Sequence, residues 1–355
     1  MSTLGLTIMG TCPTFQYGIP AAEYLERVRV AAVRAEKNGW TAMLIYSDHR
    51  QLDPWLVANL MLSGTTTISP LVAVQPLYMH PFSVAKMVSS MSMIYGRPVH
   101  LNFISGGFPR DLETFCDACS HDERYARMVE YGSIIRTLLT QKSPCSFRGK
   151  YYGVEGLQLR FGPMLPQHCA PIFTTSGSSP AGLAAARKLR ARAIQYLRPA
   201  HEYCGIQLSP DLEYGARLGI VTRDSSDKAW DDARKRFPEN PAGVEVRQYS
   251  ISISDSVWVK ELGKEVHVPE GHPYWLGPYR NNQAACPFLV GAKEVVALEL
   301  ADYIELGHRT FLIENTESDE DAEQIGNAFK LAEEIVLSRR VGARTVRSVS
   351  AQILN

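Results

Sequence analysis

Short apolar stretches alternate with amphipathic stretches along most of this chain. The apolar stretches are bounded by Gly, Pro or polar residues, which is typical of buried strands. Between them apolar residues recur at helical spacing, as at Leu25, Val28 and Ala32, until Asn38 and Gly39 end the pattern. We expect strands at 4–9, 40–46, 68–74, 99–104, 171–174, 193–196, 216–221 and 309–313. We expect helices at 21–37, 54–62, 82–94, 120–140, 180–191, 226–236, 293–306 and 319–337.

This alternation predicts a single (β/α)8 TIM barrel that spans residues 1–337 and carries insertions. A doubly wound open sheet is the alternative, but the chain has no G-x-G-x-x-G after its first strand and no G-x-x-x-x-G-K-[ST]. We also expect a small hairpin at 147–161, where the sequence reads FRGKYYGVEGLQLRF.

Two later segments do not follow the alternation. Residues 237–292 lack a clear period and contain many Pro, Gly and aromatic residues. Because long irregular segments in compact domains are often functional, we expect either an active-site lid or an exposed surface insertion there. The tail at 338–355 is rich in Arg and Ser, and we expect it to lie on the surface or to be partly disordered.

The charge balance excludes polyanionic partners. The chain has 355 residues with 37 Lys plus Arg and 37 Asp plus Glu, so no overall field favours nucleic acid or an anionic membrane surface. Its apolar runs are too short to span a bilayer, and its first residues lack the pattern of a signal peptide. We therefore expect a soluble cytoplasmic protein.

The seven cysteines do not suggest a disulfide framework, because their number is odd and they are scattered over a long chain. Cys116, Cys119 and His121 form a C-x-x-C-x-H pattern. A structural zinc site normally needs a second paired cluster, which this sequence lacks, so we expect no metal.

Chemistry in a barrel belongs at the carboxyl ends of its strands, and several polar residues follow expected strands. His49 comes after the second strand, and His80 follows the third. Both are candidates for acid or base catalysis, because a histidine titrates near neutral pH. Gln75 ends the third strand and Asn102 ends the fourth.

A serine-rich turn follows the fifth strand. It reads TSGSS and includes Ser178 and Ser179 immediately before an expected helix. Hydroxyls and free backbone N–H groups at a helix start can bind a phosphate. The alternative is an ordinary turn with a helix cap.

The stretch SHDERYARM opens another expected helix. Ser120 and Glu123 have the spacing of a capping box. His121 and Tyr125 are four residues apart and therefore lie on one face of the helix. They are either ordinary helix surface or ligand-binding residues.

Four motifs carry a resemblance to a known family: GRPVHLNFISGGFPRDLE, SHDERY, FRGKYYGVEGLQL and PIFTTSGSS. In this order they resemble the bacterial luciferase-like monooxygenases, most of all the alkanesulfonate monooxygenase branch, over residues 4–337. The resemblance implies a luciferase-type barrel that forms a homodimer or a dimer of dimers. It also implies a monooxygenase of small or medium organic molecules.

The resemblance further implies the cofactor and its chemistry. A separate flavin reductase would supply reduced FMN, which would react with dioxygen to give a flavin hydroperoxide. A non-prolyl cis peptide near 73–75 would lie under the flavin ring, which brings Gln75 to the cofactor site. Asn102 would lie near the ring, His121 and Tyr125 would reach the ribityl and phosphate side, and Ser178 and Ser179 would hold the phosphate.

The chain departs from the alkanesulfonate pattern at three positions. It has Gln51 in place of a Cys, Gly219 in place of a His and Asn315 in place of a Tyr. Two arginines are retained. Arg217 would stabilise a peroxide anion or bind an anionic substrate group, or else form a structural ion pair, and Arg280 would match a mobile-loop arginine. Because the thiol, imidazole and phenol of the alkanesulfonate pattern are absent, we do not expect an alkanesulfonate substrate, and a substrate from specialised metabolism is one expectation.

Two other functions remain open at this point. One is a deazaflavin-dependent oxidoreductase of the same superfamily, which would transfer hydride and need no dioxygen. The other is a non-catalytic flavin-binding protein, because several positions in the pocket have changed.

Overall fold

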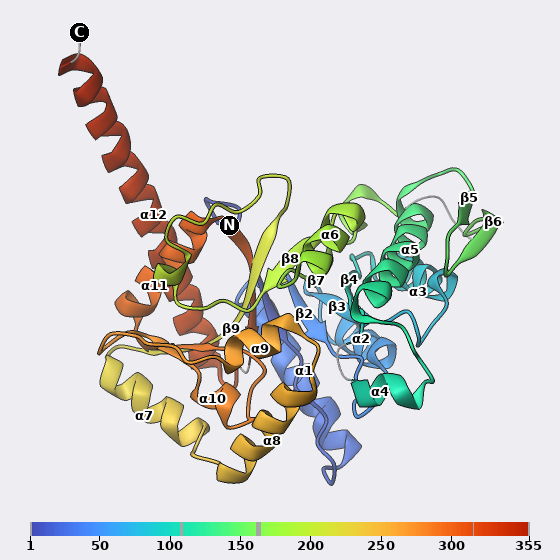
Figure 1. Cartoon of the computed structure of the whole chain (residues 1–355), viewed down its shortest axis with the longest axis horizontal. Helices are drawn as coiled ribbons and strands as arrows, with labels where there is room; N and C mark the ends of the chain where they lie inside the picture. Colours follow the sequence, from blue (N-terminus) through green and yellow to red (C-terminus); the bar gives the residue numbers. More distant parts are fainter. Residues whose placement is uncertain (1, 107–108, 161–164, 315, 354–355) are drawn as a thin grey trace.

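Eight parallel strands close into a barrel in the computed structural model, which describes residues 2–106, 109–160, 165–314 and 316–353 (Figure 1). The barrel strands are β1 (Thr7–Thr11), β2 (Ala42–Ile45), β3 (Ser69–Val74), β4 (His100–Phe103), β7 (Phe173–Ser176), β8 (Arg192–Gln195), β9 (Tyr214–Arg223) and β12 (His308–Glu314). Each strand pairs with the next in this order, and β12 pairs with β1 to close the ring. The expected (β/α)8 fold is confirmed.

Helices cover the outside of the barrel. They are α1 (Ala21–Lys37), α2 (Pro54–Ser63), α3 (Pro81–Tyr95), α4 (Pro109–Thr114), α5 (His121–Thr140), α6 (Pro180–Leu189), α7 (Ser226–Arg236), α11 (Lys293–Leu306) and α12 (Asp319–Ile353). The expected limits of α1, α7 and α11 agree with the structure. Local signals explain two of these agreements, since Gly39 after α1 and Gly307 after α11 adopt positive φ angles that favour glycine.

The barrel strands are buried on both faces. All six residues of β3 and all ten of β9 are buried, as expected of parallel strands under helices. Side chains alternate between the two faces of a strand, so one set fills the barrel interior. This inner cluster includes Met9, Leu44, Leu71 and Leu312.

The segment at 237–292 is more regular than we expected. It contains α8 (Pro241–Ile253), α9 (Val257–Gly263), β10 (Tyr274–Trp275), α10 (Gly277–Arg280) and β11 (Phe288–Ala292). β11 pairs in parallel with β9 outside the eight-strand ring, and β10 pairs antiparallel with β11. Apart from α8 these elements have seven residues or fewer, so their sequence periods are weak.

The expected hairpin is present and consists of β5 (Cys145–Arg148) and β6 (Gly153–Leu157). The carboxylate of Glu130 on α5 accepts hydrogen bonds from the backbone N–H groups of Lys150, Tyr151 and Tyr152, at 2.8, 2.8 and 3.0 Å. One carboxylate therefore fixes the hairpin turn to α5.

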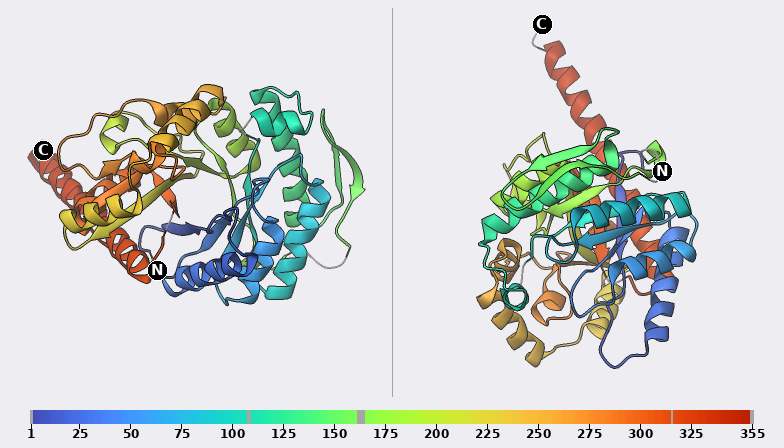
Figure 2. Two further views of the ribbon diagram at one scale, coloured as in Figure 1. Left: turned by 90° about the horizontal axis from the view of Figure 1, so that it is seen from below. Right: turned by 90° about the vertical axis from the view of Figure 1, so that its right-hand side faces the viewer.

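Two expectations about the backbone need correction. The final helix continues to Ile353 instead of ending near 337, and its last part projects from the barrel (Figures 1 and 2). No Pro interrupts the tail, so helix can propagate through it. The peptide bonds of the described residues, including those at 73–75, are trans, which is the lower-energy form.

No helix in the part of the chain that the structure describes combines the length and the apolar character needed to cross a membrane.

Candidate functional site

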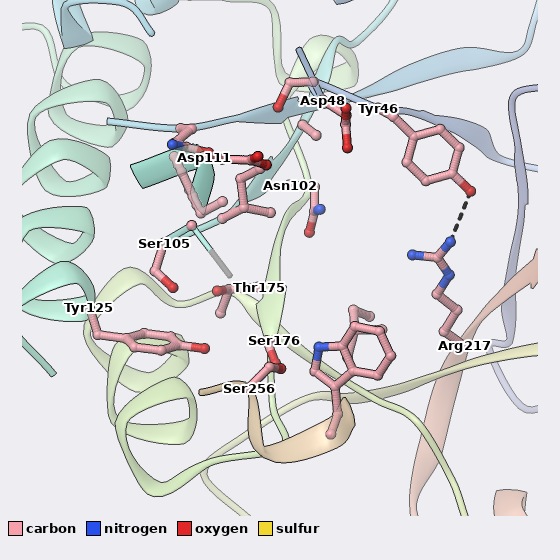
Figure 3. Close-up of a pocket in the computed structure, with 18 of the residues that line it drawn as sticks. Tyr46, Asp48, Asn102, Ser105, Asp111, Tyr125, Thr175, Ser176, Arg217 and Ser256 are labelled. Carbon is pink, nitrogen blue, oxygen red and sulfur yellow. Dashed lines mark hydrogen bonds between the residues drawn. The ribbon is translucent and has the colours of Figure 1, made fainter. Parts of the chain in front are cut away.

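A cavity of about 260 Å³ opens at the carboxyl ends of the barrel strands (Figure 3). Its walls come from the residues after β2, β3, β4, β7 and β8, together with the starts of α5 and α9. Gln75, Asn102, His121 and Tyr125 line this cavity, so the structure brings four of the sequence-predicted cofactor residues together. Arg217 also lines it.

Asn102 lies at the end of β4, where its side chain faces the cavity. Its Oδ1 accepts a hydrogen bond of 2.8 Å from Oγ1 of Thr174 on the neighbouring strand β7. This bond orients the amide and leaves its nitrogen free to donate to a ligand.

The start of α5 has the predicted capping box. The Ser120 hydroxyl accepts from the Glu123 backbone N–H, and the Glu123 carboxylate accepts from the Ser120 N–H at 3.1 Å. A hydrogen bond from Lys150, followed by those from Ser120, lowers the pKa of Glu123 to about 2. The ring centroids of His121 and Tyr125 lie 5.0 Å apart at the edge of the cavity. The capping box therefore fixes the helix end that presents both rings.

Arg124 links the same helix start to the 237–292 segment. Its guanidinium bonds to the Asp255 carboxylate and, at 3.0 Å, to the backbone carbonyl of Cys119. Asp255, Ser256 and Trp258 line the cavity, so this ion pair holds part of the segment over it.

Ser178 and Ser179 have different surroundings. Ser179 caps α6, because its Oγ accepts a 3.0 Å hydrogen bond from the Gly182 N–H, and its own proton remains available to a ligand. The Ser178 Oγ is buried and has no hydrogen-bond partner among the described residues. It lines an adjoining hollow that shares Tyr196 and Trp258 with the main cavity. An unpaired buried hydroxyl beside a helix start fits a phosphate group.

Arg217 forms a buried ion pair. Its Nε and Nη2 donate to Oε2 of Glu314 at 2.9 and 2.8 Å, and the two residues are 9% and 6% exposed. Its Nη1 and Nη2 also donate to the phenol oxygens of Tyr196 and Tyr46 at 3.1 and 2.9 Å. Burial alone would lower the pKa of Arg217, but Glu314 and the two phenols raise it well above its ordinary value.

Three candidates lie away from the cavity lining. His49 is half exposed and its Nδ1 lies 3.5 Å from the carboxylate of Asp111, which does line the cavity. His80 is exposed and caps α3, since its Nδ1 accepts from the Phe82 N–H. Arg280 is exposed and faces a separate hollow in the 237–292 segment. His80 therefore serves as a helix cap, and Arg280 lies at a different hollow from the candidate site.

Two of the three positions that depart from the alkanesulfonate pattern have structural roles. Gln51 accepts a 2.6 Å hydrogen bond from the backbone N–H of Phe15. A Cβ on Gly219 would lie 2.3 Å from the ring of Phe288, so glycine leaves room for β11. Asn315 lies outside the described residues.

Sequence reasoning missed several residues of the site. They are Tyr46, Asp111, Tyr196, Trp258 and Glu314. Tyr46 and Tyr196 directly follow barrel strands, so strand-end position is a signal that identifies them. Trp258 comes from the 237–292 segment and had no comparable signal.

No group of three or more His, Cys, Asp and Glu side chains is arranged to hold a metal ion within the described ranges. Cys119 is instead 3.7 Å from Nη1 of Arg127, and Arg127 pairs with Asp117.

The sequence is similar to a known family and to a known enzyme. Residues 8–310 match the family described as luciferase-like monooxygenase. The chain is also 31% identical over 307 residues to the 4-(gamma-L-glutamylamino)butanoyl-[BtrI acyl-carrier protein] monooxygenase of Niallia circulans. That alignment covers 84% of this chain and 89% of the relative.

Solved structures share the fold. One is the oxygenating constituent of 3,6-diketocamphane monooxygenase from Pseudomonas putida in complex with FMN, with a TM-score of 0.64 and 16% identity over 95% of this chain and 98% of that one. Another is an F420-dependent secondary alcohol dehydrogenase, with a TM-score of 0.61 and 17% identity over 92% and 99% of the two chains.

Proposed function

This chain belongs to the luciferase-like monooxygenase family, and from that premise we propose that it is a two-component enzyme that oxygenates a small or medium-sized organic substrate. It uses dioxygen and reduced FMN, and a separate flavin reductase supplies the FMN. The observation that carries this proposal is the unpaired Ser178 hydroxyl at the start of α6, next to a cavity lined by His121 and Tyr125.

The residues around the cavity have the donors that FMN requires. Ser178 and Ser179 hold the phosphate, His121 and Tyr125 contact the ribityl and phosphate side, and Asn102 and Gln75 contact the ring system. When bound, reduced FMN supplies the electrons for the activation of dioxygen.

The 237–292 segment acts as a lid in this proposal. Ser256 and Trp258 line the cavity, and Arg124 holds the neighbouring Asp255. A cover of this kind excludes water from the reacting groups.

The relative from Niallia circulans is named for a substrate on an acyl-carrier protein. An acyl group bound to a carrier, in specialised metabolism, is therefore one substrate that we propose for this chain.

Rapid mixing tests the proposed reaction. The protein is loaded with reduced FMN and mixed with dioxygenated buffer, and oxidised-flavin absorbance is followed. We expect this absorbance to return more slowly than with free FMN, because the site shields the cofactor from solvent. An unchanged rate would contradict the proposal. Preferred binding of a deazaflavin would favour hydride transfer, and tight FMN binding without oxygenation would favour a non-catalytic protein.

Replacing Ser178 with Ala is expected to weaken reduced-FMN affinity by about 10- to 150-fold, because a hydrogen bond to a charged group is worth roughly 1.5–3 kcal/mol. Thermal stability should change little, since the Ser178 Oγ has no partner within the described part of the chain. Anaerobic flavin titration and thermal unfolding measure the two effects. Ser179→Ala is the comparison, because it also removes the cap of α6 and should cost about 1 kcal/mol of stability. Unchanged affinity in Ser178→Ala would contradict its phosphate role.

We further propose that the chain forms a homodimer through α2 and α3. Leu56 on α2 and Met93 and Ile94 on α3 are exposed, and a hydrogen bond of 2.8 Å from Tyr95 to Asn59 joins the two helices. Exposed apolar side chains that gather on neighbouring helices often mark an interface. We expect Ile94→Lys to shift the mass measured by light scattering from dimer to monomer. Val30→Lys, at an exposed position on α1, is the control and should remain dimeric.

A further inference from the structure

The positive charge of Arg217 is already balanced inside the cavity. Glu314 pairs with its guanidinium through Nε and Nη2, and both side chains are almost fully buried. An organic anion that approached Arg217 would therefore meet a buried carboxylate on the same guanidinium. Two like charges at such a site are unfavourable, so this wall of the cavity disfavours anionic groups.

The donors of Arg217 are also largely used. Nε and Nη2 reach Glu314, Nη2 reaches the phenol of Tyr46, and Nη1 reaches the phenol of Tyr196. Figure 3 shows Arg217 and Tyr46 on one side of the cavity and Tyr125 on the other, with Asn102 between them. The guanidinium is therefore committed to holding the two phenols in place.

The phenol oxygens of Tyr46 and Tyr196 both accept hydrogen bonds from Arg217. The Tyr196 oxygen accepts from Arg217, but among the described residues no acceptor contacts its O–H group. Burial raises the pKa of Tyr196, so this hydroxyl keeps its proton at neutral pH. Tyr196 thus has a proton to donate to a ligand.

Trp258 fixes the position of Tyr196. The two rings stack with centroids 4.0 Å apart and an interplanar angle of 9°. Ile194 and Leu312 add apolar surface to the same cavity. A substrate at this wall therefore meets the Tyr196 hydroxyl beside the apolar side chains of Trp258, Ile194 and Leu312.

We propose that Tyr196 donates its hydroxyl proton in a hydrogen bond to an uncharged carbonyl oxygen of the substrate, as in an amide, ester, thioester or ketone. Arg217 and Glu314 act as positioning residues that orient the phenol, and the same pair excludes sulfonates and carboxylates. This inference rests on the proposed function and defines the substrate class of the same site.

Binding of two matched probes tests the inference without turnover. Hexanamide and hexane-1-sulfonate have the same chain length and differ in their polar group. Each is titrated by calorimetry into protein that is loaded with reduced FMN under anaerobic conditions. We expect wild type to bind hexanamide at least tenfold more tightly than the sulfonate.

Variants separate the two parts of the inference. Tyr196→Phe should weaken hexanamide binding by about five- to tenfold, which corresponds to one hydrogen bond between uncharged groups. Tyr17→Phe is the matched control, because Tyr17 is fully exposed and does not line the cavity, so hexanamide affinity should stay unchanged. Glu314→Gln should tighten sulfonate binding at least tenfold, because the arginine charge is then unbalanced. Circular dichroism checks that Glu314→Gln folds. If Glu314→Gln does not fold, Tyr196→Phe still tests the hydrogen-bond donor.

Three results overturn the inference. They are a wild type that prefers the sulfonate, a Tyr196→Phe variant with unchanged hexanamide affinity, and a flavin-loaded wild type that binds neither probe. Failure of the proposed function is recognised separately, because wild type would then not bind reduced FMN in the anaerobic titration or would not slow flavin oxidation in the rapid-mixing experiment.

Discussion

Arg217→Met is expected to lower the free energy of unfolding by about 3–5 kcal/mol, because it leaves the Glu314 carboxylate buried without its partner. Only 6% of Glu314 is exposed, so water cannot replace the lost charge. The remaining contacts of Glu314 include a 3.2 Å hydrogen bond from the Ala285 N–H, which does not neutralise a full charge. Urea unfolding of wild type and variant at pH 7 measures the difference.

A double variant tests the cause of that loss. Arg217→Met combined with Glu314→Gln removes both charges, so we expect it to recover most of the lost stability. Equal destabilisation in the single and double variants would mean that lost packing, not an unpaired charge, is responsible. A loss below about 1 kcal/mol in the single variant would mean that the pair is effectively exposed to solvent.

Local signals determined which parts of the fold could be predicted. The start of α7 is set by Ser225, whose Oγ accepts from the Lys228 N–H, and the end of α11 is set by Gly307. Such caps depend on a few consecutive residues. By contrast, β11 pairs with β9 where the ring of Phe288 lies against Gly219, and no short stretch of sequence contains that contact.

The candidate site likewise has residues that local sequence signals identify and residues that only contacts across the barrel bring together. Asn102, His121 and Tyr125 were found from the ends of expected strands, from helix spacing and from the family resemblance. The partners of Arg217 could not be found in this way, because Glu314 is 97 positions away and Tyr46 is 171 positions away. Contacts across the barrel bring these residues together, and spacing along the chain does not predict them.

Asp321→Asn is expected to lower the free energy of unfolding by about 3 kcal/mol, because it removes the buried charge that Arg223 and Arg236 share. Asp321 is 1% exposed, and its oxygens lie 2.9 Å from Nη2 of Arg223 and 2.9 Å from Nη2 of Arg236. The same carboxylate accepts from the Glu317 and Ser318 N–H groups, so it ties β9 and α7 to the start of α12. The loss should lie at the low end for buried pairs, because Arg223 keeps a 2.8 Å bond to Asp232.

The pH dependence of this loss has a definite sign. Burial alone would raise the pKa of Asp321, but the two guanidinium groups outweigh it and leave the pKa below its ordinary value. A carboxyl with a depressed pKa in the folded state stabilises the protein above its unfolded pKa of about 3.9, and that contribution disappears as the pH falls through the folded value. The difference between wild type and Asp321→Asn should therefore be full at pH 6 and shrink below about pH 4. Asp319→Asn is the control, because its side chain is 72% exposed and solvent screens its ion pair with Arg34, so we expect a much smaller loss. Similar losses in both variants would mean that the start of α12 is sensitive to any substitution, and that the ion pairs of Asp321 with Arg223 and Arg236 are not the cause.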